Sequence, residues 1–115
     1  MGNLDAFRDL TYVSDTVAGF LRVGETPGIE GETFNLGSGE EISIGDLAHK
    51  VVSLIGRDVE ISIDPNRLRP GKSEVQRLLS DNRLVRERVG WQPEIHLDEG
   101  LSRTIEWVRQ NLHRF

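Results

Sequence analysis

The stretch from residue 43 to residue 63 constrains the fold most, because it predicts a capped helix followed closely by a strand. Ser43 is a typical N-cap residue, and Asp46 three positions later gives a capping-box-like spacing with the shorter acid. Apolar residues then recur at helical spacing as far as Gly56, which is expected to end the helix. Residues 59–63 (VEISI) alternate strictly and predict a half-buried strand. The apolar stripe of the helix consists of Ile44, Leu47, Val51, Leu54 and Ile55.

The rest of the chain predicts three more helices and several short strands. The helices are expected from a cap at Ser14 to Gly24, after Ser80 or Asp81, and over residues 97–112. The alternation of helices and strands predicts an α/β fold with a small mixed sheet and about four helices. The short strands are expected at residues 8–13, 33–36 and 75–79.

Each helix carries an apolar stripe, and we expect the stripes of the short helix and of the last helix to face the core. Trp91, in the extended connector before the last helix, is expected to anchor that connector by packing. His49 lies off the stripe of its helix and is expected at the surface. The stripes are Val17, Phe20 and Leu21 in the first helix, with Val13 as a further candidate, Leu84, Val85 and Val89 in the short one, and Leu101, Ile105, Val108 and Leu112 in the last.

Composition excludes several classes of function. The length of 115 residues suits one domain or part of one, and the net charge of -5 argues against a nucleic-acid partner. The chain has no cysteine, and its three histidines are scattered without metal-ligand spacing. No apolar run approaches the roughly 18 residues of a membrane span, and no signal peptide begins the chain. We therefore expect a cytoplasmic protein with neither a nucleic-acid nor a membrane partner.

A basic loop at residues 67–72 is the strongest candidate binding feature. Arg67 and Arg69 precede a Pro-Gly pair, and Lys72 follows it, in an otherwise acidic chain. Guanidinium groups make paired, charge-assisted hydrogen bonds to phosphate oxygens, so the loop suits a phosphate or pyrophosphate. A solvated basic loop is the alternative interpretation.

No catalytic group accompanies this loop. Tyr12 stands in a strand-like setting, and no Ser or Thr occupies a nucleophile-elbow pattern. The glycine pair of residues 37–39 does not continue as G-x-G-x-x-G, which favours ordinary turn chemistry. Capping explains the acid pairs at 40–41 and 98–99. The chain therefore has the character of a binding portion.

Four motifs follow one another over residues 8–110: RDLTYVSDT, FNLGSGEEISIGDLA, RLRPGKSEV and SDNRLVRERVGWQPEIHLDEGLSRTIEWV. Their order and spacing resemble the C-terminal part of nucleotide-sugar dehydratases and epimerases of the extended short-chain dehydrogenase/reductase family. FNLGSG together with RPGKSEV and LLSDN is most similar to the sugar 4,6-dehydratases of the GDP-mannose and dTDP-glucose types.

The resemblance implies a Rossmann-type two-domain enzyme, whose N-terminal domain holds NAD or NADP and a catalytic Tyr-x-x-x-Lys. The C-terminal portion then binds the nucleotide-diphospho-sugar substrate, with no cofactor and no catalytic residue of its own. Arg8 matches the family arginine before D-x-x-Y-V, and Arg69 matches that of the R-P element; both are implied to contact phosphate. Glu74 resembles an acid used on the ribose, but two extra residues relative to R-P-T-E-V make Lys72 the alternative.

The sequence contains neither G-x-x-G-x-x-G nor Tyr-x-x-x-Lys. We therefore expect residues 1–115 to be the substrate-binding portion of a larger enzyme, inactive alone, with residues 1–7 a cloning remnant or a fragment edge. Family members pack the first helix and the FNLGSG strand partly on the Rossmann domain, so these faces would be exposed here or covered in a homodimer. Two alternatives stay open: the same portion of a 4-epimerase or reductase, and a free-standing nucleotide-binding or interaction module.

Overall fold

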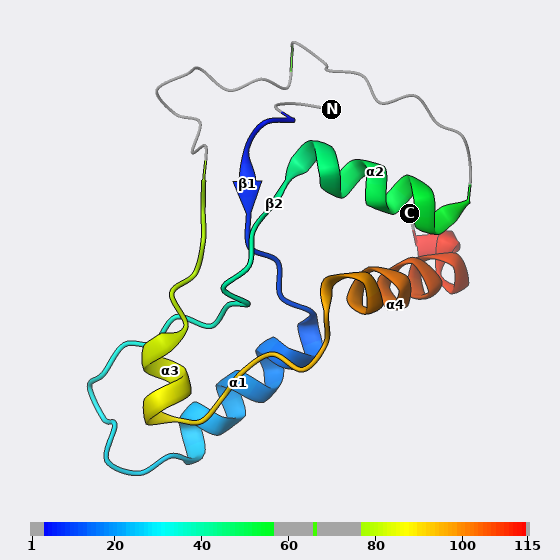
Figure 1. The fold of residues 1–115 in the computed structure, drawn as a ribbon. Helices are drawn as coiled ribbons and strands as arrows, with labels where there is room; N and C mark the ends of the chain where they lie inside the picture. Colours follow the sequence, from blue (N-terminus) through cyan, green and yellow to red (C-terminus); the bar gives the residue numbers. More distant parts are fainter. Residues whose placement is uncertain (1–3, 57–65, 67–76, 115) are drawn as a thin grey trace.

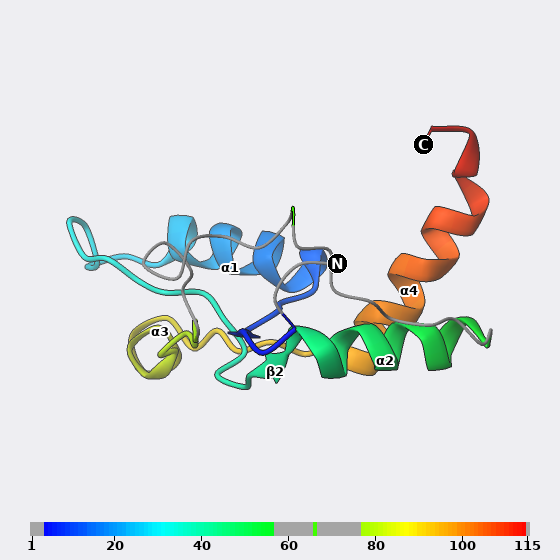
Figure 2. The ribbon, with the colours of Figure 1, turned by 90° about the horizontal axis from the view of Figure 1, so that it is seen from above.

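The computed structural model describes residues 4–56, 66 and 77–114. The expected strand at 59–63 and the basic loop at 67–72 lie outside the described residues. Helices α1 (Val13–Glu25) and α3 (Arg83–Arg88) lie at one end of the molecule, with two short strands between them and the other pair (Figure 1). That pair, α2 (Ile44–Ile55) and α4 (Leu97–Gln110), lies at the other end. The view from above shows the same division (Figure 2).

A small sheet joins the two ends. Strand β1 (Phe7–Arg8) pairs antiparallel with β2 (Ile42–Ser43). Phe7 also forms an isolated parallel bridge with Arg77. The predicted α/β fold with a small sheet and four α-helices is confirmed in the described part of the chain.

Of the predicted strands, one forms over a shorter stretch, one does not form, and one is described only in part. The strand expected over residues 8–13 is only two residues long and starts one residue earlier. Residues 33–36 form no strand, because Phe34 and Leu36 pack against the core cluster instead of pairing with a neighbouring strand. Of the run at 75–79, the described residues contribute only the bridge at Arg77.

Helix α2 (Ile44–Ile55) forms as its sequence predicts. The Ser43 hydroxyl accepts a hydrogen bond from the Asp46 amide at 3.0 Å, which satisfies one of the free donors of the first turn. Gly56 ends the helix in the left-handed conformation, with φ of 82°. His49 is exposed, as expected.

Helix α1 (Val13–Glu25) differs from its prediction at both ends. Its N-cap is Tyr12, not Ser14, and the amides of Asp15 and Thr16 donate to the Tyr12 carbonyl. The helix also continues through Gly24 and stops before Pro27. The residue before a proline is disfavoured in the α conformation, and the C-cap Thr26 is extended accordingly.

The main core cluster lies between α1, α3 (Arg83–Arg88) and the connector that follows α3. Trp91 is only 2% exposed, which confirms that it anchors the connector. The cap of α3 is Asn82 rather than Ser80 or Asp81. Leu84 was expected to face inward but is 46% exposed, because this short helix buries only one narrow face. The cluster consists of Ile29, Val85, Val89 and Trp91, with Val23, Phe34 and Leu36 packed against it.

Helix α4 (Leu97–Gln110) packs against α2 and is followed by the 3-10 turn η2 (Leu112–Arg114). Its stripe residues up to Val108 are half-buried, as expected. Leu112 is 63% exposed, so its assignment to the buried stripe was wrong. The helix ends at Asn111, and the tighter turn removes Leu112 from the helical register.

None of the helices that the structure describes combines the length and apolar character that a membrane crossing requires. Helix α1 presents an exposed apolar stripe. The exposed fractions are 66% for Val13, 51% for Val17, 68% for Phe20 and 61% for Leu21. These exposed fractions agree with the expectation for the first helix, whereas Phe34 and Leu36 of the FNLGSG stretch, also expected to be uncovered, pack against the core cluster.

Candidate functional site

Arg8 is the predicted phosphate ligand that lies within the described residues. It is half-buried on β1, where its backbone pairs with Ile42. Its guanidinium Nη1 donates to the Phe7 carbonyl at 2.7 Å, which folds the side chain back along its own strand. The other predicted ligands, Arg69, Lys72 and Glu74, lie outside the described residues.

The carboxylate of Asp9, next to Arg8, joins three segments that are far apart in the sequence. It accepts hydrogen bonds from the Ser38 amide at 3.0 Å and from the Ser38 hydroxyl. It also accepts from the Gly39 amide at 2.9 Å and from the Ser80 amide at 3.1 Å. We call this arrangement of Asp9, Ser38, Gly39 and Ser80 the Asp9 clasp. A carboxylate with both oxygens engaged by donors in this way is suited to holding backbone in place.

A second set of contacts joins β1 to residues 77–80, on the side of Arg8 away from Asp9. The Phe7 carbonyl accepts the Leu78 amide at 3.0 Å, in addition to the Arg8 guanidinium. The Arg77 guanidinium lies over the Phe7 ring, 4.8 Å from its centroid, and pairs with Glu41 at 2.9 Å. Residues 77–80 are therefore fixed against β1 both before and after Arg8.

The close packing of the clasp explains why residues 37 and 39 of the turn are glycines. A Cβ on Gly37 would lie 2.2 Å from the Ser80 Cβ, so a larger residue cannot pack there without movement. The Asn82 amide donates to the Gly37 carbonyl at 2.9 Å and is buried. Gly39 has φ of 76°. The interpretation of these glycines as turn residues agrees with the geometry.

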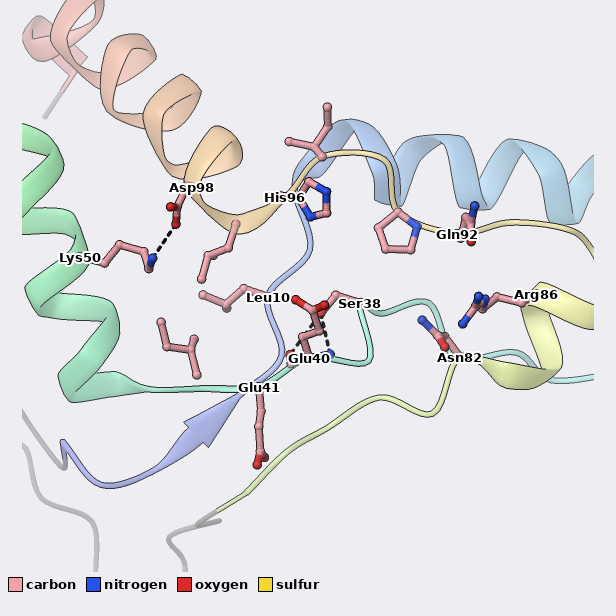
Figure 3. A pocket seen from close by; sticks show the side chains of 14 residues that line it. Leu10, Ser38, Glu40, Glu41, Lys50, Asn82, Arg86, Gln92, His96 and Asp98 are labelled. Atoms are coloured by element: carbon pink, nitrogen blue, oxygen red, sulfur yellow. Dashed lines mark hydrogen bonds and ion pairs between the residues drawn. The ribbon is translucent and has the colours of Figure 1, made fainter.

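A cavity of about 560 Å³ adjoins the clasp through Ser38 and is also lined by Asn82 (Figure 3). The Lys50–Asp98 ion pair, at 2.6 Å, lies at one end of it, and Arg86 lies at the other. Groups of both signs line this cavity, so it lacks the concentrated positive charge that a diphosphate requires. Further lining residues include Leu10, Glu40, Glu41, Gln92 and His96.

Near the clasp, the pKa of one carboxyl group is strongly shifted. The hydrogen bonds from the Arg83 side chain and amide lower the pKa of Asp81 to about 2. This pair is exposed and lies one residue beyond Ser80. In the described ranges 4–56, 66 and 77–114, no group of three or more acids and histidines could hold a metal ion.

The clasp was not predicted from the sequence. Asp9 was seen only as part of the RDLTYVSDT motif, and Ser38 only as part of a turn. Its partners are 29 to 71 residues away along the chain, so no local spacing connects them. Tyr12, expected to fill a strand, instead caps α1 and contacts the position of Gly100 on α4. The one signal in the sequence was that an acid, Asp9, stands next to Arg8, the predicted phosphate ligand.

Comparisons with known proteins agree on a family. The family model described as GDP-mannose 4,6 dehydratase matches residues 1–104. A UDP-glucose 4-epimerase of Mycolicibacterium smegmatis is 36% identical over 102 residues, covering 89% of this chain and 31% of the relative. The chain thus spans about a third of the length of that relative.

Solved structures show the same relationship. UDP-glucose 4-epimerase of Thermotoga maritima, with UDP-glucose, has a TM-score of 0.86 and 31% identity, covering 97% of this chain and 34% of that one. RMD from Pseudomonas aeruginosa, complexed with NADPH, has a TM-score of 0.83 and 26% identity, covering 96% of this chain and 35% of that one. The predicted resemblance to the C-terminal part of an extended short-chain dehydrogenase/reductase is confirmed.

Proposed function

The chain belongs to the GDP-mannose 4,6 dehydratase family, and from this premise we propose that it is the substrate-binding portion of an NAD(P)-dependent nucleotide-sugar 4,6-dehydratase. It binds the diphosphate of a nucleotide-diphospho-sugar and is inactive alone. The carrying observation is the fixed position of Arg8, between the two contacts that hold residues 77–80 against β1. These contacts fix the backbone on both sides of Arg8, and the guanidinium itself donates to the Phe7 carbonyl, so the side chain starts from a partly ordered position when it binds phosphate.

In this proposal Arg8 supplies one positive group of the diphosphate site. Arg69 and Lys72 supply further charge from the basic loop, and Glu74 or Lys72 contacts the ribose. The support for the loop residues is their match to the family motif and their charge, since they lie outside the described residues. Two or three cationic groups around two phosphates are the usual requirement for tight diphosphate recognition.

The nicotinamide cofactor is assigned to the rest of the intact protein. In the intact protein this cofactor would supply reversible hydride transfer, which together with the loss of water from the sugar would give the 4-keto-6-deoxy product of a dehydratase. The chain supplies neither a G-x-x-G-x-x-G turn nor a Tyr-x-x-x-Lys pair, so its residues do not fit the cofactor, and we assign them no step in hydride transfer. Their part is to bind and orient the substrate.

We further propose that the remainder of the intact protein covers the exposed stripe of α1. Phe20 and Leu21 are more than 60% exposed, which is costly for a face with four large apolar side chains. A cavity that includes Phe20 continues this surface, with an apolar part formed by Phe34, Leu36, Leu78 and Leu79 beside polar residues such as Thr16 and Asn35. In the isolated chain, a second copy is the alternative cover.

A 4-epimerase or reductase is the second candidate function, favoured by the 36% identity to a UDP-glucose 4-epimerase. The deciding experiment incubates the intact protein with GDP-mannose, dTDP-glucose and UDP-glucose and follows the sugar by NMR. Formation of a 4-keto-6-deoxy sugar supports the dehydratase, and inversion at C4 supports the epimerase. Binding of nucleoside diphosphates by the isolated chain at micromolar affinity would instead support a free-standing binding module.

A further inference from the structure

We propose that residues 33–36 are an open strand edge, and that an extended, apolar strand from the remainder of the intact protein pairs with them. This inference rests on the proposed function, because it takes the chain as one portion of a larger protein. It deepens the proposed cover of the α1 stripe by stating which backbone groups the covering element binds.

The first argument is the extended character of residues 33–36. Phe34 and Leu36 are half-buried and pack against the core cluster, whereas Thr33 and Asn35 are exposed. An extended chain produces this period of two in burial, because successive side chains point to opposite faces. One face of the segment is therefore already packed as the face of a strand would be.

The second argument is the backbone of the same segment. Within the part of the chain that the structure describes, the amides and carbonyls of residues 33–36 form no hydrogen bond. The connector after α3 is also irregular, but the Asp15 carboxylate accepts its amides at Glu94 and Ile95. An extended segment whose backbone groups stay unpaired is a template for the addition of another strand.

The third argument is the apolar surface beside this segment. A cavity of about 670 Å³ is lined by residues 34–36, by residues 78–81 and by Phe20 of α1. Leu78 and Leu79 are 51% and 50% exposed there, and Phe20 is 68% exposed. A strand paired with residues 33–36 would remove these side chains from water, which is favourable in proportion to the area buried.

The charges at this cavity indicate the kind of strand that fits. Its two carboxylates already have donors: Asp9 accepts backbone amides, and Asp81 pairs with Arg83 at 2.7 Å. A charged side chain brought to this surface would lose water without gaining an opposite charge, which is costly. The partner is therefore a strand with apolar side chains toward the cavity, which binds residues 33–36 through its main chain.

Hydrogen exchange on the intact protein tests the pairing, with the exposed amide of Gly31 in the preceding turn as the internal reference. Every second amide of a strand points to the same neighbour, so two alternate amides of residues 33–36 should exchange about 100-fold or more slowly than that of Gly31. Exchange of all four amides at the Gly31 rate would overturn the inference. Protection that appears only at high protein concentration would also overturn it, because the partner would then be a second copy.

A matched pair of variants of the intact protein tests the apolar contact. Leu79→Asp and Leu84→Asp introduce the same charge at side chains of similar exposure, 50% and 46%. Leu79 lines the cavity, whereas Leu84 lies on α3 outside it. Leu79→Asp should accelerate exchange of the protected amides about tenfold or more, and Leu84→Asp less than about twofold. Equal effects would contradict the inference, and Leu79→Ala decides the matter if Leu79→Asp does not fold.

The strand pairing and the proposed function fail separately. An intact protein that converts a nucleotide-sugar but leaves residues 33–36 unprotected would overturn the strand pairing alone. An intact protein with protected amides that binds neither UDP nor GDP by calorimetry and turns over no nucleotide-sugar would overturn the proposed function, while the pairing would stand.

Discussion

Asp15 and Trp91 hold α1 against the connector that leads to α4. The Trp91 indole N–H donates to the Asp15 carbonyl at 2.9 Å. The Asp15 carboxylate accepts the amides of Glu94 and Ile95, each at 3.0 Å. Both Asp15 and Trp91 are buried, at 5% and 2% exposure. One short segment of α1 thus satisfies the polar groups of a connector that has no regular secondary structure.

The first prediction concerns this contact. Asp15→Asn leaves one acceptor oxygen for two amides and turns an amide donor toward the second one. We expect the free energy of unfolding to fall by about 2 kcal/mol or more, the cost of a buried unsatisfied donor. Urea unfolding measures it, with Asp98→Asn as the control, because that carboxylate is exposed and its ion pair with Lys50 contributes at most about 1 kcal/mol. Equal losses in both variants would contradict the assignment.

The second prediction contrasts two glycines. Gly37→Ala places a methyl group against Ser80 and should destabilise the chain by about 1–3 kcal/mol, through overpacking. Gly24→Ala adds the same methyl group inside α1 with nothing within 4 Å, and should stabilise it by about 0.5–1 kcal/mol. Thermal unfolding of the two variants should therefore shift in opposite directions. A stabilised Gly37→Ala would be inconsistent with the close packing of the clasp.

The third prediction concerns pH. The pKa of Asp81 is lowered to about 2 by Arg83, so the ionised pair favours the folded state above the unfolded pKa of roughly 4. This contribution is lost as the pH falls from about 4 through 2. NMR titration of the Asp81 carboxyl carbon should give a midpoint near 2 in wild type and a higher midpoint in Arg83→Gln, which loses the side-chain donor but keeps the backbone amide of residue 83. A midpoint that does not move on this substitution would show that Arg83 is not the cause.

The fourth prediction concerns the exposed stripe of α1. If a second copy covers this face in the isolated chain, sedimentation should show association that increases with concentration. Phe20→Asp should abolish it, because a charge in the centre of an apolar contact is costly. Leu84→Asp is the control, since Leu84 is 46% exposed on α3 and lies outside the stripe. A wild-type chain that stays monomeric at high concentration would contradict the prediction.

Local signals in the sequence determined the elements whose causes are local. Ser43 and Gly56 specify the two ends of α2 through a side-chain cap and a left-handed glycine, and both ends are where the sequence places them. The burial of Trp91 also follows from local sequence, whereas the exposure of the α1 stripe was expected only from the resemblance to the family. The order of the four motifs was sufficient to identify the family, because a motif consists of residue types at given spacings and can be read without the structure.

Tertiary structure decided everything that depends on partners distant in the chain. Residues 33–36 have strand-like side chains but pack into the core, because no strand lies beside them in the described part of the chain. Leu84 follows the apolar pattern of α3 yet remains exposed, since the burial of a short helix depends on which face its neighbour covers. The Asp9 clasp joins segments up to 71 residues apart. Only the folded chain brings them within hydrogen-bonding distance, because the energy of that contact depends on position in space and not on spacing in the sequence.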